Sequence, residues 1–246
     1  MKYIELLGLP GSGKTTLLRA FRDRGFAGQA GKVVLSEDWP MVIRRLGYRD
    51  VGLLRGRKKR EPEVSRQKVL SNHLLDRWQM GVFDKYPELF AQIFLCFKTV
   101  VHDDRQRAIL LNYWRSRISL YLDVSHSTNP SFCVVDEGLS QTVFSTMTRM
   151  MAPSNRKLEL VDSVLRCLPS ERTVIMLQTP RELIEMRAQS GKGRSSEDLS
   201  RRLGELDFIF QQQNKLGVDS FELDGSLSTD ELCIELEAKI NRTGKG

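Results

Sequence analysis

Eight residues near the amino end, Gly8–Thr15, constrain this chain more than any other stretch. They read GLPGSGKT and satisfy every fixed position of the phosphate-binding loop pattern G-x-x-x-x-G-K-[ST]. Residues 2–7 before them are typical of a short strand, and residues 16–21 after them are typical of the first turns of a helix. This strand–loop–helix context predicts a nucleoside triphosphate site, because a glycine-rich turn without function would not account for three spaced glycines.

The residue types in the loop explain how it would bind ATP. Its glycines let the backbone curl into a nest whose N–H groups point inward at an anion. The dipole of the following helix adds positive potential at the same place. Lys14 is expected to reach the β- and γ-phosphates, and the Thr15 hydroxyl to bind Mg²⁺. The predicted ATP-binding residues here are Gly8, Gly11, Ser12, Gly13, Lys14, Thr15 and Thr16.

Strand-like and helix-like segments alternate along the chain, as a parallel sheet requires. The five candidate strands are residues 2–7, 32–35, 132–135, 173–177 and 220–223. We therefore expect a single α/β domain over residues 1–246, of the three-layer αβα P-loop NTPase type with a mostly parallel sheet. Residues 55–125 read as a helical insert for an acceptor, with helices expected over 65–80, 87–101 and 104–124. Residues 187–198 read as a lid.

Carboxylates follow two of these strands, and ligands of parallel sheets bind at the carboxyl ends of strands. Asp136 ends the apolar run 132–135, which is the pattern of a Walker B strand, and Glu137 follows it. Because two adjacent carboxylates are costly without a cation, Thr15, Asp136 and Glu137 are the predicted Mg²⁺ ligands. Glu37 and Asp38 close the second strand, where a carboxylate could activate an acceptor hydroxyl. A helix cap or a turn acid explains these two nearly as well.

Two arginines are candidates for stabilising a transferring phosphoryl group. Arg187 lies near the end of a predicted helix, and Arg194 lies in the basic, glycine-flanked loop that follows. Guanidinium groups reaching the γ-phosphate from outside the loop would lower the barrier to transfer. The alternative is a solvated basic loop. The predicted catalytic residues are Lys14, Glu37, Asp38, Asp136, Arg187 and Arg194.

The charge and the cysteines of the chain limit which partners the protein can bind and where in the cell it is expected. The formal net charge is +7, and ten basic residues lie between Arg44 and Lys68, opposed by three acidic ones. The segment Arg55–Arg60 is either a solvated loop or a surface for an acidic substrate or a nucleic-acid backbone. The four scattered cysteines have no metal-binding spacing. No stretch is apolar enough for a membrane span, and the amino end reads as strand and loop rather than a secretory signal. We expect a cytoplasmic protein without a membrane partner.

With these residues in view, the chain resembles the P-loop kinases that phosphorylate nucleosides and nucleoside monophosphates, most closely the thymidylate kinase and deoxynucleoside kinase branches. The likeness is strongest at Gly8–Thr15 and moderate from Thr179 to Arg194, which resembles the strand, helix and arginine-bearing lid of that group. It implies that Asp224 and the residues after it contact adenine, and that Glu37 and Asp38 lie where deoxynucleoside kinases carry their base. Where these kinases usually have an arginine after the third-strand acid, this chain has Glu137.

Three functions follow from these features. The first is transfer of the γ-phosphate of ATP to a small nucleoside-like or nucleotide-like acceptor. The second is an ATPase or NTP-driven switch, in which Glu137 polarises water and a protein partner reads the nucleotide state. The third is a polynucleotide end kinase, with Arg55–Arg60 on the phosphate backbone. The identity of the acceptor and the existence of a homodimer stay open.

Overall fold

A parallel sheet forms the middle of the molecule. The computed structural model describes residues 2–24, 33–35, 84–99, 104–126, 132–189 and 196–243. In these ranges a five-stranded sheet has the order β2-β3-β1-β4-β5, and each neighbouring pair is parallel. The strands are β1 (Lys2–Leu7), β2 (Val33–Leu35), β3 (Phe132–Val135), β4 (Thr173–Gln178) and β5 (Asp219–Asp224). The order places the carboxyl ends of β1 and β3 side by side, so the loops that follow them meet.

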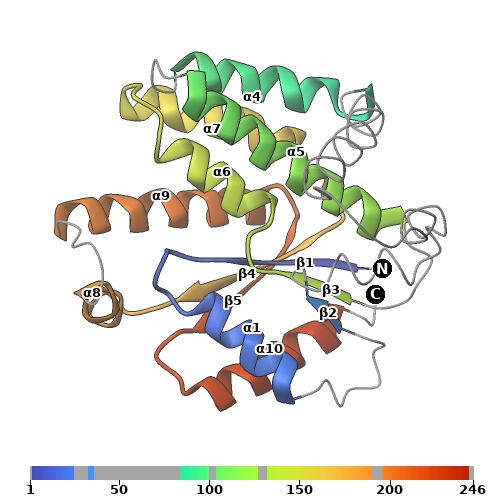
Figure 1. Ribbon diagram of the computed structural model, residues 1–246, viewed down its shortest axis with the longest axis vertical. Coiled ribbons are helices and arrows are strands. Elements are labelled where there is room, and N and C mark those ends of the chain that lie inside the picture. The colour runs from blue at the N-terminus through green and yellow to red at the C-terminus, as the bar shows by residue number, and fades with distance from the viewer. Residues whose placement is uncertain are drawn as a thin grey trace, which may run out of the picture.

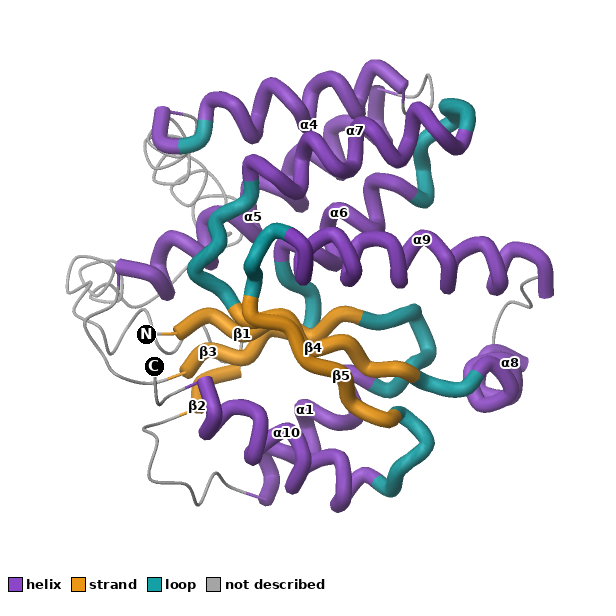
Figure 2. The backbone as a smooth tube through the Cα atoms, turned by 180° about the vertical axis from the view of Figure 1, so that it is seen from behind, coloured by secondary structure: helices purple, strands orange, loops and turns teal. Residues whose placement is uncertain are grey.

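Helices cover both faces of the sheet (Figures 1 and 2). One face carries α1 (Lys14–Arg24) and α10 (Thr229–Thr243). The opposite face carries α4 (Pro87–Thr99), α5 (Asp104–His126), α6 (Leu139–Met147), α7 (Ser154–Cys167) and α9 (Ser196–Lys215). The short helix α8 (Arg181–Gln189) follows β4 beyond the carboxyl end of the sheet. The predicted three-layer α/β class is therefore confirmed.

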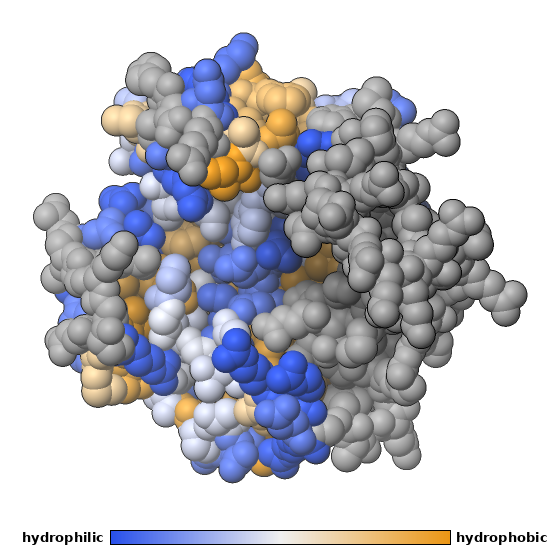
Figure 3. Space-filling view, in the orientation of Figure 1, coloured by the Kyte–Doolittle hydropathy of each residue, from blue (hydrophilic) through white to orange (hydrophobic). Residues whose placement is uncertain are grey.

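Burial explains why these segments form a sheet with two covered faces. β3 is buried along its whole length, and β1 is buried after its first residue. Near-continuous apolar runs of this kind are typical of parallel strands covered on both sides. Two apolar clusters result, one beneath the larger helix group and one beneath α1 and α10. In the space-filling view, the middle of the face between the two helix groups is mainly hydrophilic (Figure 3).

Most of the helices and strands predicted from the sequence have counterparts in the structure, and one helix was not predicted. The helices predicted over 87–101 and 104–124 correspond to α4 (Pro87–Thr99) and α5 (Asp104–His126). The helix α6, which directly follows the Asp136 turn, was not predicted. The predicted helix over 65–80 and the basic run Arg55–Arg60 lie outside the described residues, so both stay predictions. None of the helices in the described ranges is long and apolar enough to cross a membrane.

Candidate active site

The loop between β1 and α1 is curled rather than extended. Gly11 and Gly13 have φ values of 90° and 102°, in the left-handed region that favours glycine. The Ser12 amide donates to the Leu9 carbonyl at 3.0 Å, which closes a turn. The Leu17 amide then donates to the Gly13 carbonyl at 2.9 Å as α1 begins. This is the local geometry that the glycine spacing predicts for an anion nest at a helix amino end.

Replacing Gly13 by alanine is expected to cost about 1–2 kcal/mol of folding free energy, because a Cβ is strained at positive φ. The new methyl group would also lie 3.3 Å from the Arg187 guanidinium. Urea denaturation measures the loss. Gly204→Ala in α9 is the control, because a Cβ there meets nothing within 4 Å and alanine is favoured in a helix interior. Equal stability of the two variants would contradict the curled loop.

The Lys14 side chain is buried over this loop. Its Nζ donates to the Gly8 carbonyl at 2.7 Å and to the Leu9 carbonyl at 3.1 Å. Burial lowers the pKa of Lys14, and the nearby carboxylates of Asp136 and Glu137 partly oppose that shift. A buried ammonium held by two neutral carbonyls is a strong electrostatic attractor for an anion, because little solvent screens it. The predicted phosphate-neutralising lysine is thus at the loop.

Thr15 and Asp136 meet beside Lys14, although 121 positions separate them in the sequence. The Thr15 hydroxyl donates to Asp136 Oδ2 at 2.5 Å. The other carboxylate oxygen, Oδ1, is buried and has no hydrogen-bond partner among the described residues. A buried carboxylate oxygen without a donor is costly unless a cation or a water meets it. This pair of oxygens therefore fits Mg²⁺, which binds proteins through one or two carboxylates, waters and substrate phosphates.

No group of three His, Cys, Asp or Glu side chains within the described ranges forms a metal cage. Mg²⁺ in nucleotide sites is typically bound by one or two carboxylates together with waters and substrate phosphates. The hydroxyl and carboxylate would supply the protein's share of the ligands, and the phosphates the rest.

Glu137 points toward α5 rather than standing free beside Asp136. Its Oε2 accepts hydrogen bonds from the Tyr113 hydroxyl and, at 3.2 Å, from Arg117 Nη2. The Arg117 guanidinium also lies over the Tyr113 ring, 4.9 Å from its centroid. Burial raises the pKa of Tyr113, and the bond to Glu137 raises it further, so the phenol stays protonated and donates. Sequence reasoning named neither Tyr113 nor Arg117.

A cavity of about 550 Å³ lies beside the phosphate loop. It is lined by residues 9–17, by Asp136, Glu137, Gln141 and Arg187, and by Gly225, Leu227, Thr229 and Leu232. Its volume is within the range of small-molecule sites. The lining includes the exposed Thr16 and the loop after β5, in agreement with the rule that ligands bind at the carboxyl ends of parallel strands.

Helix α8 brings Arg187 against the outside of the phosphate loop. Its Nη1 donates to the Ser12 carbonyl at 3.0 Å and to the Gly11 carbonyl at 3.4 Å. The Thr179 hydroxyl, at the end of β4, also donates to the Ser12 carbonyl at 2.9 Å. Arg187 therefore contacts the loop, and its role in stabilising a transferring phosphoryl group stays a prediction. Arg194, Glu37 and Asp38 lie outside the described residues, so their roles stay predictions.

Asp224 is the last residue of β5, and its carboxylate makes hydrogen bonds within the turn that follows. Oδ1 accepts from the Ser226 amide at 2.9 Å and from the Ser226 hydroxyl at 2.6 Å. These two bonds lower the pKa of Asp224. The cavity lining includes Gly225 rather than Asp224. The carboxylate thus shapes the turn that borders the cavity, and its predicted contact with nucleotide stays a prediction.

Gln141 is a site residue that sequence reasoning missed. Its Oε1 accepts a hydrogen bond from the Gly8 amide at 3.2 Å, and the side chain lines the cavity. Gln141 belongs to α6, so its place at the loop depends on a helix that the local pattern did not reveal. Its place in the sequence could have revealed it. Gln141 comes shortly after the strand that ends before Asp136, and in this topology the residues after that strand lie near the loop that follows β1.

Two solved structures illustrate what the chain is similar to. One is deoxyadenosine kinase from M. mycoides with bound dATP, at 14% identity and a TM-score of 0.46, covering 97% of this chain and 99% of that one. Another is thymidylate kinase from Candida albicans, at 15% identity and a TM-score of 0.49, covering 98% and 92%. No protein-family model and no curated protein matches the sequence.

Proposed function

We propose that this protein transfers the γ-phosphate of Mg²⁺·ATP to a small acceptor of nucleoside or nucleotide type. The observation that carries the proposal is the pairing of Thr15 with Asp136 next to the buried Lys14, with one Asp136 oxygen that has no hydrogen-bond partner in the part of the chain that the structure describes. A lysine, a hydroxyl and a carboxylate at one end of a curled loop are the parts that hold a triphosphate and its metal ion.

The roles divide among the loop and its neighbours. Backbone amides of the loop and Lys14 bind the phosphates, while Thr15 and Asp136 hold Mg²⁺, which when bound neutralises charge that develops on the phosphoryl oxygens. Arg187 reaches the same oxygens from the rim of the loop, aided by Arg194. For a hydroxyl acceptor, its oxygen bonds to the γ-phosphorus and the bond to the β–γ bridging oxygen breaks. The hydroxyl proton passes to Glu37 or Asp38.

The contacts of α5 support an acceptor that approaches from the side of Glu137. The kinases that this chain resembles carry an arginine after the third-strand acid, and here α5 places Arg117 within 3.2 Å of the residue in that position. Its side chain is 20% exposed, and its Nε is buried without a hydrogen-bond partner among the described residues. A guanidinium so placed can bind a hydroxyl or a phosphate of the acceptor.

A cytoplasmic location and a homodimer remain expectations from the sequence.

The direct test is incubation with γ-labelled ATP and Mg²⁺ in the presence of nucleosides, nucleoside monophosphates, sugars or oligonucleotides. We expect label on a nucleoside or a nucleoside monophosphate, with little phosphate released when no acceptor is present. Fast hydrolysis without an acceptor would contradict the proposal and favour the ATPase. Label on oligonucleotides alone would favour the polynucleotide end kinase.

Glu137→Gln separates a kinase from an ATPase. In an ATPase that uses Glu137 to polarise water, the change is expected to trap bound ATP. In the proposed kinase, transfer should persist at a reduced rate, because the attacking group is the acceptor rather than a water, and Tyr113 and Arg117 hold Oε2 of Glu137 toward α5. Single-turnover transfer and hydrolysis measure the two outcomes. Glu222→Gln on β5 is the control, since Glu222 is exposed and does not line the cavity.

A further inference from the structure

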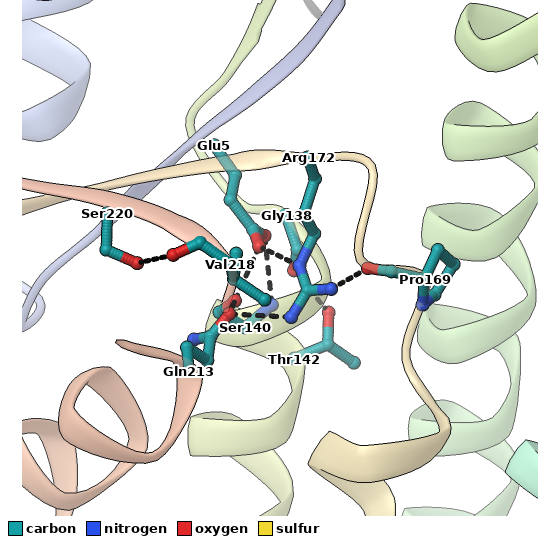
Figure 4. A network of polar contacts seen from close by, with 9 residues as sticks. All are labelled: Glu5, Gly138, Ser140, Thr142, Pro169, Arg172, Gln213, Val218 and Ser220. Atoms are coloured by element: carbon teal, nitrogen blue, oxygen red, sulfur yellow. Dashed lines mark hydrogen bonds and ion pairs between the residues drawn. The ribbon is translucent and has the colours of Figure 1, made fainter. Parts of the chain in front are cut away.

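A buried ion pair between Glu5 and Arg172 lies next to Gly138, in the turn after β3 (Figure 4). Glu5 in the middle of β1 is fully buried, and the Arg172 side chain, just before β4, is 1% exposed. Arg172 Nε donates to Glu5 Oε1 at 3.1 Å. The guanidinium also donates to the Gln213 side chain at 2.6 Å and to the Pro169 carbonyl. Burying two charges is expensive, so a pair with this many hydrogen bonds needs a structural account.

Glu5 also caps the missed helix α6. Its Oε2 accepts from the Ser140 amide at 2.9 Å, and its Oε1 accepts from the Ser140 hydroxyl at 2.5 Å. The residue that precedes α6, Gly138, makes no side-chain capping bond. A carboxylate at the first turn satisfies free amides and meets the positive end of the helix dipole. Glu5 therefore supplies, from a neighbouring strand, the cap that the helix's own sequence lacks.

The same carboxylate sets the path of the turn itself. A Cβ built on Gly138 would lie 2.0 Å from Glu5 Oε2 and 2.4 Å from Glu5 Cβ, so this backbone is packed against Glu5. Gly138 lies two residues after Asp136, and Ser140 lies one residue before Gln141. The turn and the start of α6 thus carry two site contacts, Asp136 to Thr15 and Gln141 to the Gly8 amide.

We infer that Glu5 is a positioning residue for the metal–ATP site. It holds the turn and the first residues of α6 so that the Asp136 carboxylate stays aimed at the Mg²⁺ position and Gln141 stays on the phosphate loop. Glu5 touches no reacting atom and acts through these two residues. The inference rests on the proposed function, because it assigns Glu5 to the same Mg²⁺·ATP site.

The test compares Glu5→Gln and Gly138→Ala with wild type by titrating Mg²⁺ at fixed ATP. Binding of a fluorescent ATP analogue in EDTA gives the metal-free affinity. We expect the Mg²⁺ concentration for half-maximal transfer to rise by about 10- to 100-fold, the usual effect of losing a group that orients a metal ligand. The metal-free affinity should change far less. If Glu5→Gln leaves Arg172 unpaired and fails to fold, and the Cβ of Gly138→Ala also prevents folding, Ser140→Ala decides, because it removes only the hydroxyl that donates to Glu5 Oε1.

Val143→Ala is the matched control, because Val143 is buried in α6 and has no polar side-chain atom that could join the hydrogen bonds of the ion pair. It should lower thermal stability and leave the Mg²⁺ requirement unchanged. The inference is overturned if folded Glu5→Gln, or the folded variant that replaces it in the test, keeps the wild-type requirement, or if Val143→Ala shifts it equally. Failure of wild type to bind ATP in a Mg²⁺-dependent way would instead refute the proposed function.

Discussion

Replacing Lys14 by alanine is expected to remove most ATP affinity and to lower phosphoryl transfer by about 10²- to 10³-fold, the usual effect of deleting one preorganised donor at developing charge. The reason is geometric. The ammonium is buried over the loop, where the Gly8 and Leu9 carbonyls hold it within 3.1 Å. A cation from solution therefore cannot replace it there without an added free-energy cost. Equilibrium binding of ATP and single-turnover transfer measure the two losses.

Arg19→Ala is the control for this variant, because Arg19 is exposed on the same helix and does not line the cavity. It removes one positive charge without touching the loop, so affinity should fall little. The thermal midpoint of Lys14→Ala should be recorded as well, since the Gly8 and Leu9 carbonyls lose their donor. An alanine variant that is folded and binds ATP as tightly as wild type would refute the assigned role of Lys14.

Replacing Asp136 by asparagine is expected to lower Mg²⁺-dependent transfer by on the order of 10²-fold, because the charged metal ligand is lost while the shape is kept. The Thr15 hydroxyl still has an oxygen to donate to, so the loop should stay folded. ATP affinity without Mg²⁺ should not fall, since a carboxylate that repels the phosphates has been removed. Titrations of Mg²⁺ and of ATP separate these effects.

Asp219→Asn provides the comparison, because Asp219 is exposed at the amino end of β5, at the opposite end of the sheet from the loop. Its Mg²⁺ dependence should match wild type. If Asp136→Asn retained the wild-type Mg²⁺ requirement, the pairing of Thr15 with Asp136 would be a structural hydrogen bond and the metal position would have to be sought elsewhere.

The parts of the site that could be predicted are those encoded locally. The phosphate loop has a fixed spacing of glycine, lysine and threonine, and its curl follows from the left-handed φ of Gly11 and Gly13. Asp136 could be identified because a buried parallel strand is an apolar run, and its first polar residue falls at the edge where ligands bind. The register of β1 with β3 then brings the two together without further information.

The parts that were missed depend on distant contacts. Helix α6 reads LSQTVFSTM and is rich in serine and threonine, which have weak helix propensity. It forms because its side chains are buried and because Glu5 caps it from β1. Glu5 itself looks like an isolated polar residue in an apolar strand. Arg117 and Tyr113 lie 20 and 24 positions from Glu137, and only the packing of α5 brings them to it.

The central claim is that the loop Gly8–Thr15 binds the polyphosphate of a nucleotide. Calorimetric titration of wild type with ATP, adenosine and inorganic tripolyphosphate, each with Mg²⁺, tests it most directly. Saturable ATP binding that tripolyphosphate competes away, with far weaker binding of adenosine, is the predicted result. Adenosine binding as tightly as ATP, or no saturable binding of either phosphate compound, would contradict it.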